Sequence, residues 1–200
     1  MSKIARLVVL VTALSSLFAM LSATAGATTW HNTGGTFFHA TGGPITFSRG
    51  GVSLTCAGST ATGTAPGGTT VAQHYNITGT LTFQPCMLSG QNAYVHCHYT
   101  FTGTTQPVAT GSVLGSFTPT CLARLSSLNT PLCHFEGSLP ISYTNASGAT
   151  PGRLTLSASN TLTFTNSTNP CPLGTGTGAL TEYTITMTSV VTSPHINRFA

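Results

Sequence analysis

Histidine and glutamate side chains recur beside cysteines in two segments, and together they could bind a metal ion. His96 and His98 flank one cysteine in "YVHCHYTF" at 94–101, and His134 and Glu136 follow another in "CHFE". Residues i and i+2 of a β-strand point to the same side, so each pair can present two ligands together. Imidazole and carboxylate groups are common ligands of Zn²⁺, and imidazole also binds copper. If the two strands were neighbours, these four side chains would form a zinc or copper site.

The same four residues also fit a simpler interpretation. They alternate with apolar residues, and any hydrophilic side chain satisfies a strand that has one wet face. No further carboxylate lies nearby in the sequence to orient the imidazoles. We therefore expect no cofactor, and a metal-binding secreted enzyme built on this cluster is the alternative.

Other catalytic arrangements find little material in this chain. Its acidic residues are Glu136 and Glu182, about 45 positions apart, and it has no aspartate. A pair of carboxylates for glycoside hydrolysis would need both glutamates, and a Ser-His-acid triad lacks both aspartate and the G-x-S-x-G turn. We therefore expect a protein that is not an enzyme.

The charge distribution excludes nucleic acid as a partner. The formal net charge of +4 falls to +2 when Lys3 and Arg6 are set aside, because four arginines then face two glutamates. Those arginines are scattered along the chain, whereas phosphate backbones are bound by clustered lysine and arginine.

The first residues have the pattern of an export signal. Lys3 and Arg6 precede an apolar stretch at 7–21, and small residues follow, so cleavage is expected near Ala25 or Ala27. The apolar run is shorter than the roughly 20 residues that a spanning helix needs. We therefore predict a signal peptide at 1–27 and one β-domain at 28–200, secreted to the extracellular space or the cell-envelope exterior, with no membrane span after cleavage.

Alternation with period two predicts an all-β protein. Several segments place apolar residues on one face and threonine or serine on the other, which is typical of antiparallel sheets. The apolar faces are Tyr75, Ile77, Leu81 and Phe83; Val95, Cys97, Tyr99 and Phe101; Cys133, Phe135, Leu139, Ile141 and Tyr143; Leu154, Leu156, Leu162 and Phe164; and Tyr183, Ile185 and Met187. With Gly, Pro and Asn clusters between them, these segments favour an antiparallel β-sandwich, or an open barrel, of about 8–10 strands. The segment "CLARLSSLN" at 121–129 predicts one short turn of helix.

Six cysteines follow the predicted cleavage site, and in an exported protein they indicate three disulfides. A weak repeat relates 83–103 to 117–137, each with a proline before one cysteine and a histidine after the next. The repeat favours the pairs Cys86–Cys97, Cys121–Cys133 and Cys56–Cys171. The alternative joins the cysteines in chain order, as Cys56–Cys86, Cys97–Cys121 and Cys133–Cys171.

Aromatic residues near the beginning of the predicted domain could bind sugar. Trp30 lies close to Phe37 and Phe38 in a Gly- and Thr-rich stretch, and such rings are useful in ligand clefts. The alternative is that this stretch forms the first strands, with Phe37 or Phe38 in the core.

The chain from its signal peptide onward resembles a loose group of uncharacterised secreted six-cysteine β-proteins of actinobacteria. The resemblance rests on "LTCAGSTATGT", "HCHYTF", "LCHF", "ISYTNA" and "CPLGTGTG". It implies a secreted β-fold and no catalytic residues. We expect a binding or structural role, with a cell-wall polysaccharide or a protein as partner, and the sequence does not define the oligomeric state.

Overall fold

The computed structural model describes residues 28–106, 111–127, 133–156, 161–166 and 171–199. Within these ranges the chain forms β-strands and no helix, so the predicted all-β, antiparallel architecture is confirmed. None of the described residues forms a helix with the length and apolar character needed to cross a membrane. The strands are β1 (Thr28–Asn32), β2 (Phe37–Gly42), β3 (Ile45–Arg49), β4 (Val52–Cys56), β5 (Ser59–Thr64), β6 (Gly68–Ala72), β7 (Tyr75–Leu88), β8 (Gln91–Thr105), β9 (Ser112–Leu125), β10 (Cys133–Glu136), β11 (Leu139–Thr144), β12 (Arg153–Leu156), β13 (Thr161–Asn166), β14 (Gly176–Leu180), β15 (Tyr183–Met187) and β16 (Ile196–Phe199).

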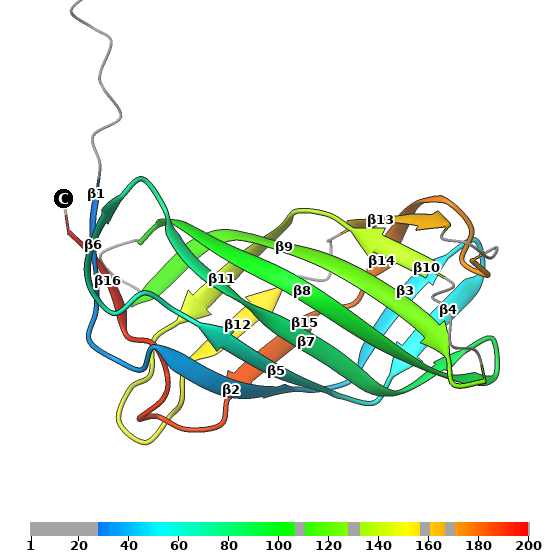
Figure 1. Ribbon diagram of the computed structural model, residues 1–200, viewed down its shortest axis with the longest axis horizontal. Coiled ribbons are helices and arrows are strands. Elements are labelled where there is room, and N and C mark those ends of the chain that lie inside the picture. Colours follow the sequence, from blue (N-terminus) through cyan, green and yellow to red (C-terminus); the bar gives the residue numbers. More distant parts are fainter. Residues whose placement is uncertain (1–27, 107–110, 128–132, 157–160, 167–170, 200) are drawn as a thin grey trace, which may run out of the picture.

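Most of these strands form a sheet that closes on itself. The long strands β7, β8 and β9 pair in chain order, and the shorter strands come in consecutive twos, each two taking the place of one long strand. The last two, β14 and β15, pair with β3 and β2 respectively, and these pairings close the sheet. Figure 1 shows the resulting long cylinder, whose strands run obliquely to its axis. Closure leaves this sheet without the unpaired edges at which open sheets associate.

The alternation seen in the sequence divides the inside of the cylinder from the outside. The apolar faces predicted from the sequence are all buried, and the intervening threonines lie on the outer surface. Threonine suits this surface because its β-branch favours extended backbone and its hydroxyl stays in water. Neighbouring threonines also bond across strands, as Thr62 does with Thr80 at 3.0 Å.

Side chains fill the interior of the cylinder. Phe47, Phe83, Phe135 and Tyr183 form a chain of contacts with ring centroids 5.0–5.6 Å apart. The cavity that remains among these rings measures about 20 Å³, which is room for about one water molecule. This space is too small for an organic ligand, so a binding site for one has to lie on the outer surface.

The three disulfides follow the chain-order pattern, and the pairing favoured by the repeat is wrong. Cys56–Cys86, Cys97–Cys121 and Cys133–Cys171 are joined. The favoured Cys86–Cys97 bridge fails because the hairpin places Cys86 opposite Ala93 and Cys97 opposite Leu81. Cys133 likewise lies opposite Ala123, which excludes its expected bridge to Cys121.

The prediction of a helical turn at 121–129 is also wrong, because the described residues up to Leu125 form a β-strand. Strand β9 continues to Leu125 and stays paired with β8, with Arg124 opposite Tyr94. Its leucines have helix-like spacing, but Cys121 and Ala123 are buried while Leu122 is exposed, so the strand period holds. Residues 128 and 129 lie outside the described ranges.

A three-stranded sheet, β16-β1-β6, lies across one end of the cylinder (Figure 1). Trp30 in its central strand is fully buried against Tyr75, with the ring centroids 5.9 Å apart, and Arg198 lies over the indole. Phe38 is also fully buried, whereas Phe37 is 51% exposed. The core interpretation therefore holds for Phe38, and the sugar-binding interpretation of Trp30 is wrong because its ring faces the interior.

The buried amide of Asn32 ties this end sheet to its surroundings. Its Nδ2 donates to the carbonyls of Gly35 and Pro66 at 3.1 and 3.0 Å, and its Oδ1 accepts from the backbone of Gly34 and His195 at 2.9 Å each. The amide thus donates two hydrogen bonds and accepts two. Its isosteres Asp and Leu cannot make the same four bonds.

Substitution Asn32→Asp should therefore loosen the end sheet. A carboxylate cannot donate to the two carbonyls, and it adds a buried charge, so we expect a loss of about 2–4 kcal/mol. The fluorescence of Trp30, the one tryptophan of the chain, reports on this region. We expect red-shifted emission at lower urea concentration than in the wild type. Asn76→Asp on the exposed face of β7 is the control, and an unchanged Trp30 transition in Asn32→Asp would contradict this role.

Candidate functional site

The four residues of the predicted metal site lie on the outer surface in two separate pairs. His96 and His98 project from β8 with ring centroids 5.3 Å apart. His134 and Glu136 project from β10, with Nε2 and Oε2 3.8 Å apart. Strand β9 separates β8 from β10 and pairs with both of them, so the two strands do not adjoin as the site would require.

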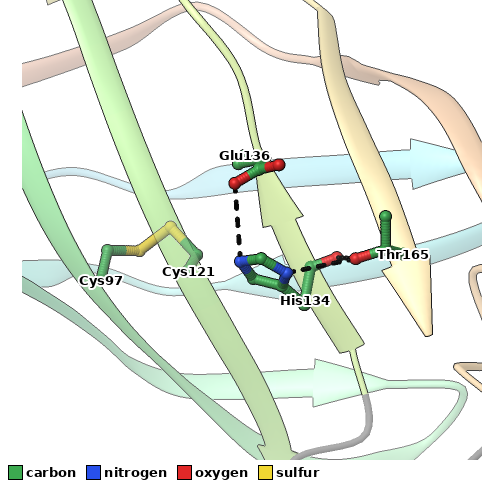
Figure 2. A network of polar contacts seen from close by, with 5 residues as sticks. All are labelled: Cys97, Cys121, His134, Glu136 and Thr165. Carbon is green, nitrogen blue, oxygen red and sulfur yellow. Dashed lines mark hydrogen bonds and ion pairs between the residues drawn. A yellow bond between two sulfur atoms is a disulfide. The ribbon is translucent and has the colours of Figure 1, made fainter. Parts of the chain in front are cut away.

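Both ring nitrogens of His134 already have partners. Figure 2 shows His134 with one ring nitrogen directed to Glu136 and the other to Thr165 on β13. Nδ1 lies 3.2 Å from the Thr165 hydroxyl, which fixes the ring orientation. Within the described ranges, no three His, Cys, Asp or Glu side chains gather closely enough to hold a metal ion. The metal site therefore stays a prediction from the sequence.

Two adjoining hollows on the outer face of β7, β8 and β9 form a different candidate site, which we call the β7–β9 groove. The first has a volume of about 430 Å³ and the second about 490 Å³. The first is lined by Thr82, Gln84, Tyr94, His96, Leu122 and Arg124, and the second by Thr78, Gly79, Thr80, His98, Tyr99, Thr100, Thr118 and Thr120. From Thr78 to Gln84 the groove follows β7 over six residue steps, or roughly 20 Å. The groove is long and lies along the strands, so it suits a chain-like ligand better than a compact one.

A tyrosine and an arginine mark one end of the groove. Tyr94 on β8 lies directly opposite Arg124 on β9, and the guanidinium carbon is 4.3 Å from the centre of the tyrosine ring. The attraction between a cation and the ring face holds both side chains in place. The two together offer a flat apolar surface beside a set of N–H donors.

Polar side chains continue from this end along the groove. His96 Nδ1 lies 3.1 Å from the Thr82 hydroxyl, so that bond orients the ring. Leu122 lies between His96 and His134 in the cross-strand row and is 44% exposed. Hydroxyl, amide, imidazole and apolar groups thus alternate over a short distance. This mixture can bond the hydroxyls of a sugar and pack against the C–H faces of its ring.

A sequence motif indicates His96 and His98 as site residues, whereas no motif indicates Tyr94 or Arg124. The latter two lie 30 positions apart, and only the register of β8 against β9 brings them together. The Cys97–Cys121 disulfide defines that register, because the two cysteines lie opposite each other. Tyr94 and Arg124 lie three residues further along their strands and are therefore opposite each other too. Correct pairing of these cysteines would have predicted the contact.

Fold and groove together define a closed antiparallel β-cylinder, disulfide-bonded inside and coated with hydroxyl groups outside. No family model, curated protein or solved structure matches this chain. The resemblance to secreted actinobacterial proteins therefore stays a prediction.

Proposed function

We propose that this protein is a secreted, non-catalytic binding protein that holds polysaccharide in the β7–β9 groove. The pairing of Tyr94 with Arg124 at the end of an open groove lined with hydroxyl groups is the observation that carries this proposal. The filled interior supports an external site. Three buried disulfides are consistent with a protein that acts outside the cytoplasm.

A polysaccharide fits this groove better than a folded protein partner does. Stable protein interfaces have a well-packed apolar centre, whereas the second hollow is lined by five threonines, a glycine, a histidine and a tyrosine. A strip of hydroxyl groups with the ring of Tyr94 at one end instead matches a polymer that itself presents hydroxyl groups and C–H faces. Its repeating units can contact successive residues of the strands.

Depletion of the protein from solution by insoluble polysaccharides tests this proposal. Peptidoglycan, chitin, cellulose and calcium-crosslinked pectate would each be incubated with the protein, and the free fraction measured. We expect at least one of them to retain the wild type. Tyr94→Ala should weaken that binding about tenfold, or about 1.4 kcal/mol, because it removes the ring face.

The matched control is Phe37→Ala, which removes an exposed ring from β2 outside the groove. It should bind as the wild type does. Failure of every polysaccharide to retain the protein would contradict the proposal, and so would an equal effect of the two substitutions.

A further inference from the structure

Arg124 differs from the arginines that have structural contacts. Arg49 donates to the carbonyl of Leu173 at 2.8 Å, and Arg198 bonds to Thr28 and lies over Trp30. Among the described residues, Arg124 has no hydrogen bond or ion pair, and its guanidinium lies over the ring of Tyr94. Its side chain is exposed. The N–H donors of its guanidinium are therefore available to a ligand in the groove.

The electrostatic character of this end of the groove follows from the absence of acidic side chains in its lining. The first hollow contains Arg124 and no carboxylate. The nearest acidic residue along the cross-strand rows is Glu136, which lies beyond β9 and faces His134. An anionic group that enters beside Tyr94 thus meets a guanidinium without a competing negative charge.

We propose that the β7–β9 groove selects polysaccharides whose sugars carry a carboxylate, with Arg124 binding the carboxylate and Tyr94 packing against the sugar ring. This inference rests on the proposed function. A planar guanidinium matches a carboxylate with two parallel N–H···O bonds. One arginine balances the single charge of a uronate, whereas a polymer of sulfate or phosphate groups calls for clustered cations.

Two polymers with the same backbone test the inference. Polygalacturonate and its fully methyl-esterified form differ in the charge of the carboxyl group and keep the same sugar ring. By affinity electrophoresis at low salt, we expect the wild type to bind the acid form at least about fivefold more tightly. The preference should shrink as salt is added, because the groove is open to solvent.

The substitution Arg124→Gln should abolish the preference, so that the acid and ester polymers bind this variant equally. Arg153→Gln is the matched control, since Arg153 is exposed on β12 outside the groove lining. It should keep the full preference. The emission of Trp30 in each variant verifies that the fold is intact.

Four outcomes would overturn the inference. Equal binding of acid and ester polymers would do so while leaving the proposed function in place, as would a preference that survives Arg124→Gln. Equally tight binding of sulfated dextran or polyglutamate would show general attraction to polyanions rather than selection of acidic sugars. Binding to no polysaccharide at all would overturn both proposals.

Discussion

Reduction of the three disulfides should unfold this protein at room temperature. The bridges join residues 30, 24 and 38 positions apart in the sequence. On the chain-entropy account, loops of this size contribute about 3.5–4 kcal/mol each, or about 11 kcal/mol together. A typical domain is stable by only about 5–15 kcal/mol, so little stability would remain.

Urea denaturation of oxidised and reduced protein, followed by Trp30 fluorescence and far-UV circular dichroism, measures this effect. The cysteines are 5% exposed or less, so reduction should be carried out in denaturant before refolding by dilution. Replacement of Cys97 and Cys121 together by alanine removes one bridge and should lower the free energy of unfolding by about 3.5 kcal/mol. A reduced protein that refolds with an unchanged urea midpoint would show that the bridges contribute little.

Raising the pH above 10 should unfold the oxidised protein cooperatively. Burial raises the pKa of the Tyr75 phenol to about 12, and it also raises the pKa of Tyr99, Tyr143 and Tyr183. The unfolded chain releases these protons near pH 10, while the folded chain keeps them. The stability is therefore complete below pH 10 and is lost as the pH rises from 10 through the raised pKa values.

The four phenols together make this a large effect. At pH 12 each buried tyrosine should lower the free energy of unfolding by about 2–3 kcal/mol, and the four together should lower it by roughly 10 kcal/mol. Tyrosinate absorbance and circular dichroism would be recorded at the same pH values, and we expect the two signals to change together. Tyr94→Phe is the control, because it leaves the buried set intact. Gradual ionisation of all tyrosines near pH 10 with an unchanged dichroism spectrum would refute the prediction.

The strands could be predicted from the sequence because burial in a two-sided sheet leaves a direct mark on it. Tyr75, Ile77, Leu81 and Phe83 alternate with asparagine and threonine, and their strand has the predicted inner face. Closure of the sheet could not be predicted in the same way. It depends on the pairing of β15 with β2, residues almost 150 positions apart, and no local pattern encodes that contact.

The register between strands separates the correct predictions from the wrong ones. The turn at Ser89 and Gly90 brings Leu88 opposite Gln91, which already excludes a bridge between Cys86 and Cys97. The weak repeat concealed this, because it aligned cysteines by their neighbours in sequence and not by their partners across the hairpin. The groove could not be predicted from the sequence for the same reason. Histidines on one strand form a visible motif, whereas Tyr94 and Arg124 come together only through the pairing of β8 with β9.

Nuclear magnetic resonance mapping of a bound oligosaccharide tests the central claim most directly. A fragment of the polysaccharide that retains the protein would be added to isotope-labelled protein, and amide shifts followed. The account predicts that the largest shifts fall on the outer residues of β7, β8 and β9, with Tyr94, His96 and Arg124 among them. Shifts that cluster on the β16-β1-β6 sheet or elsewhere outside the groove would contradict it.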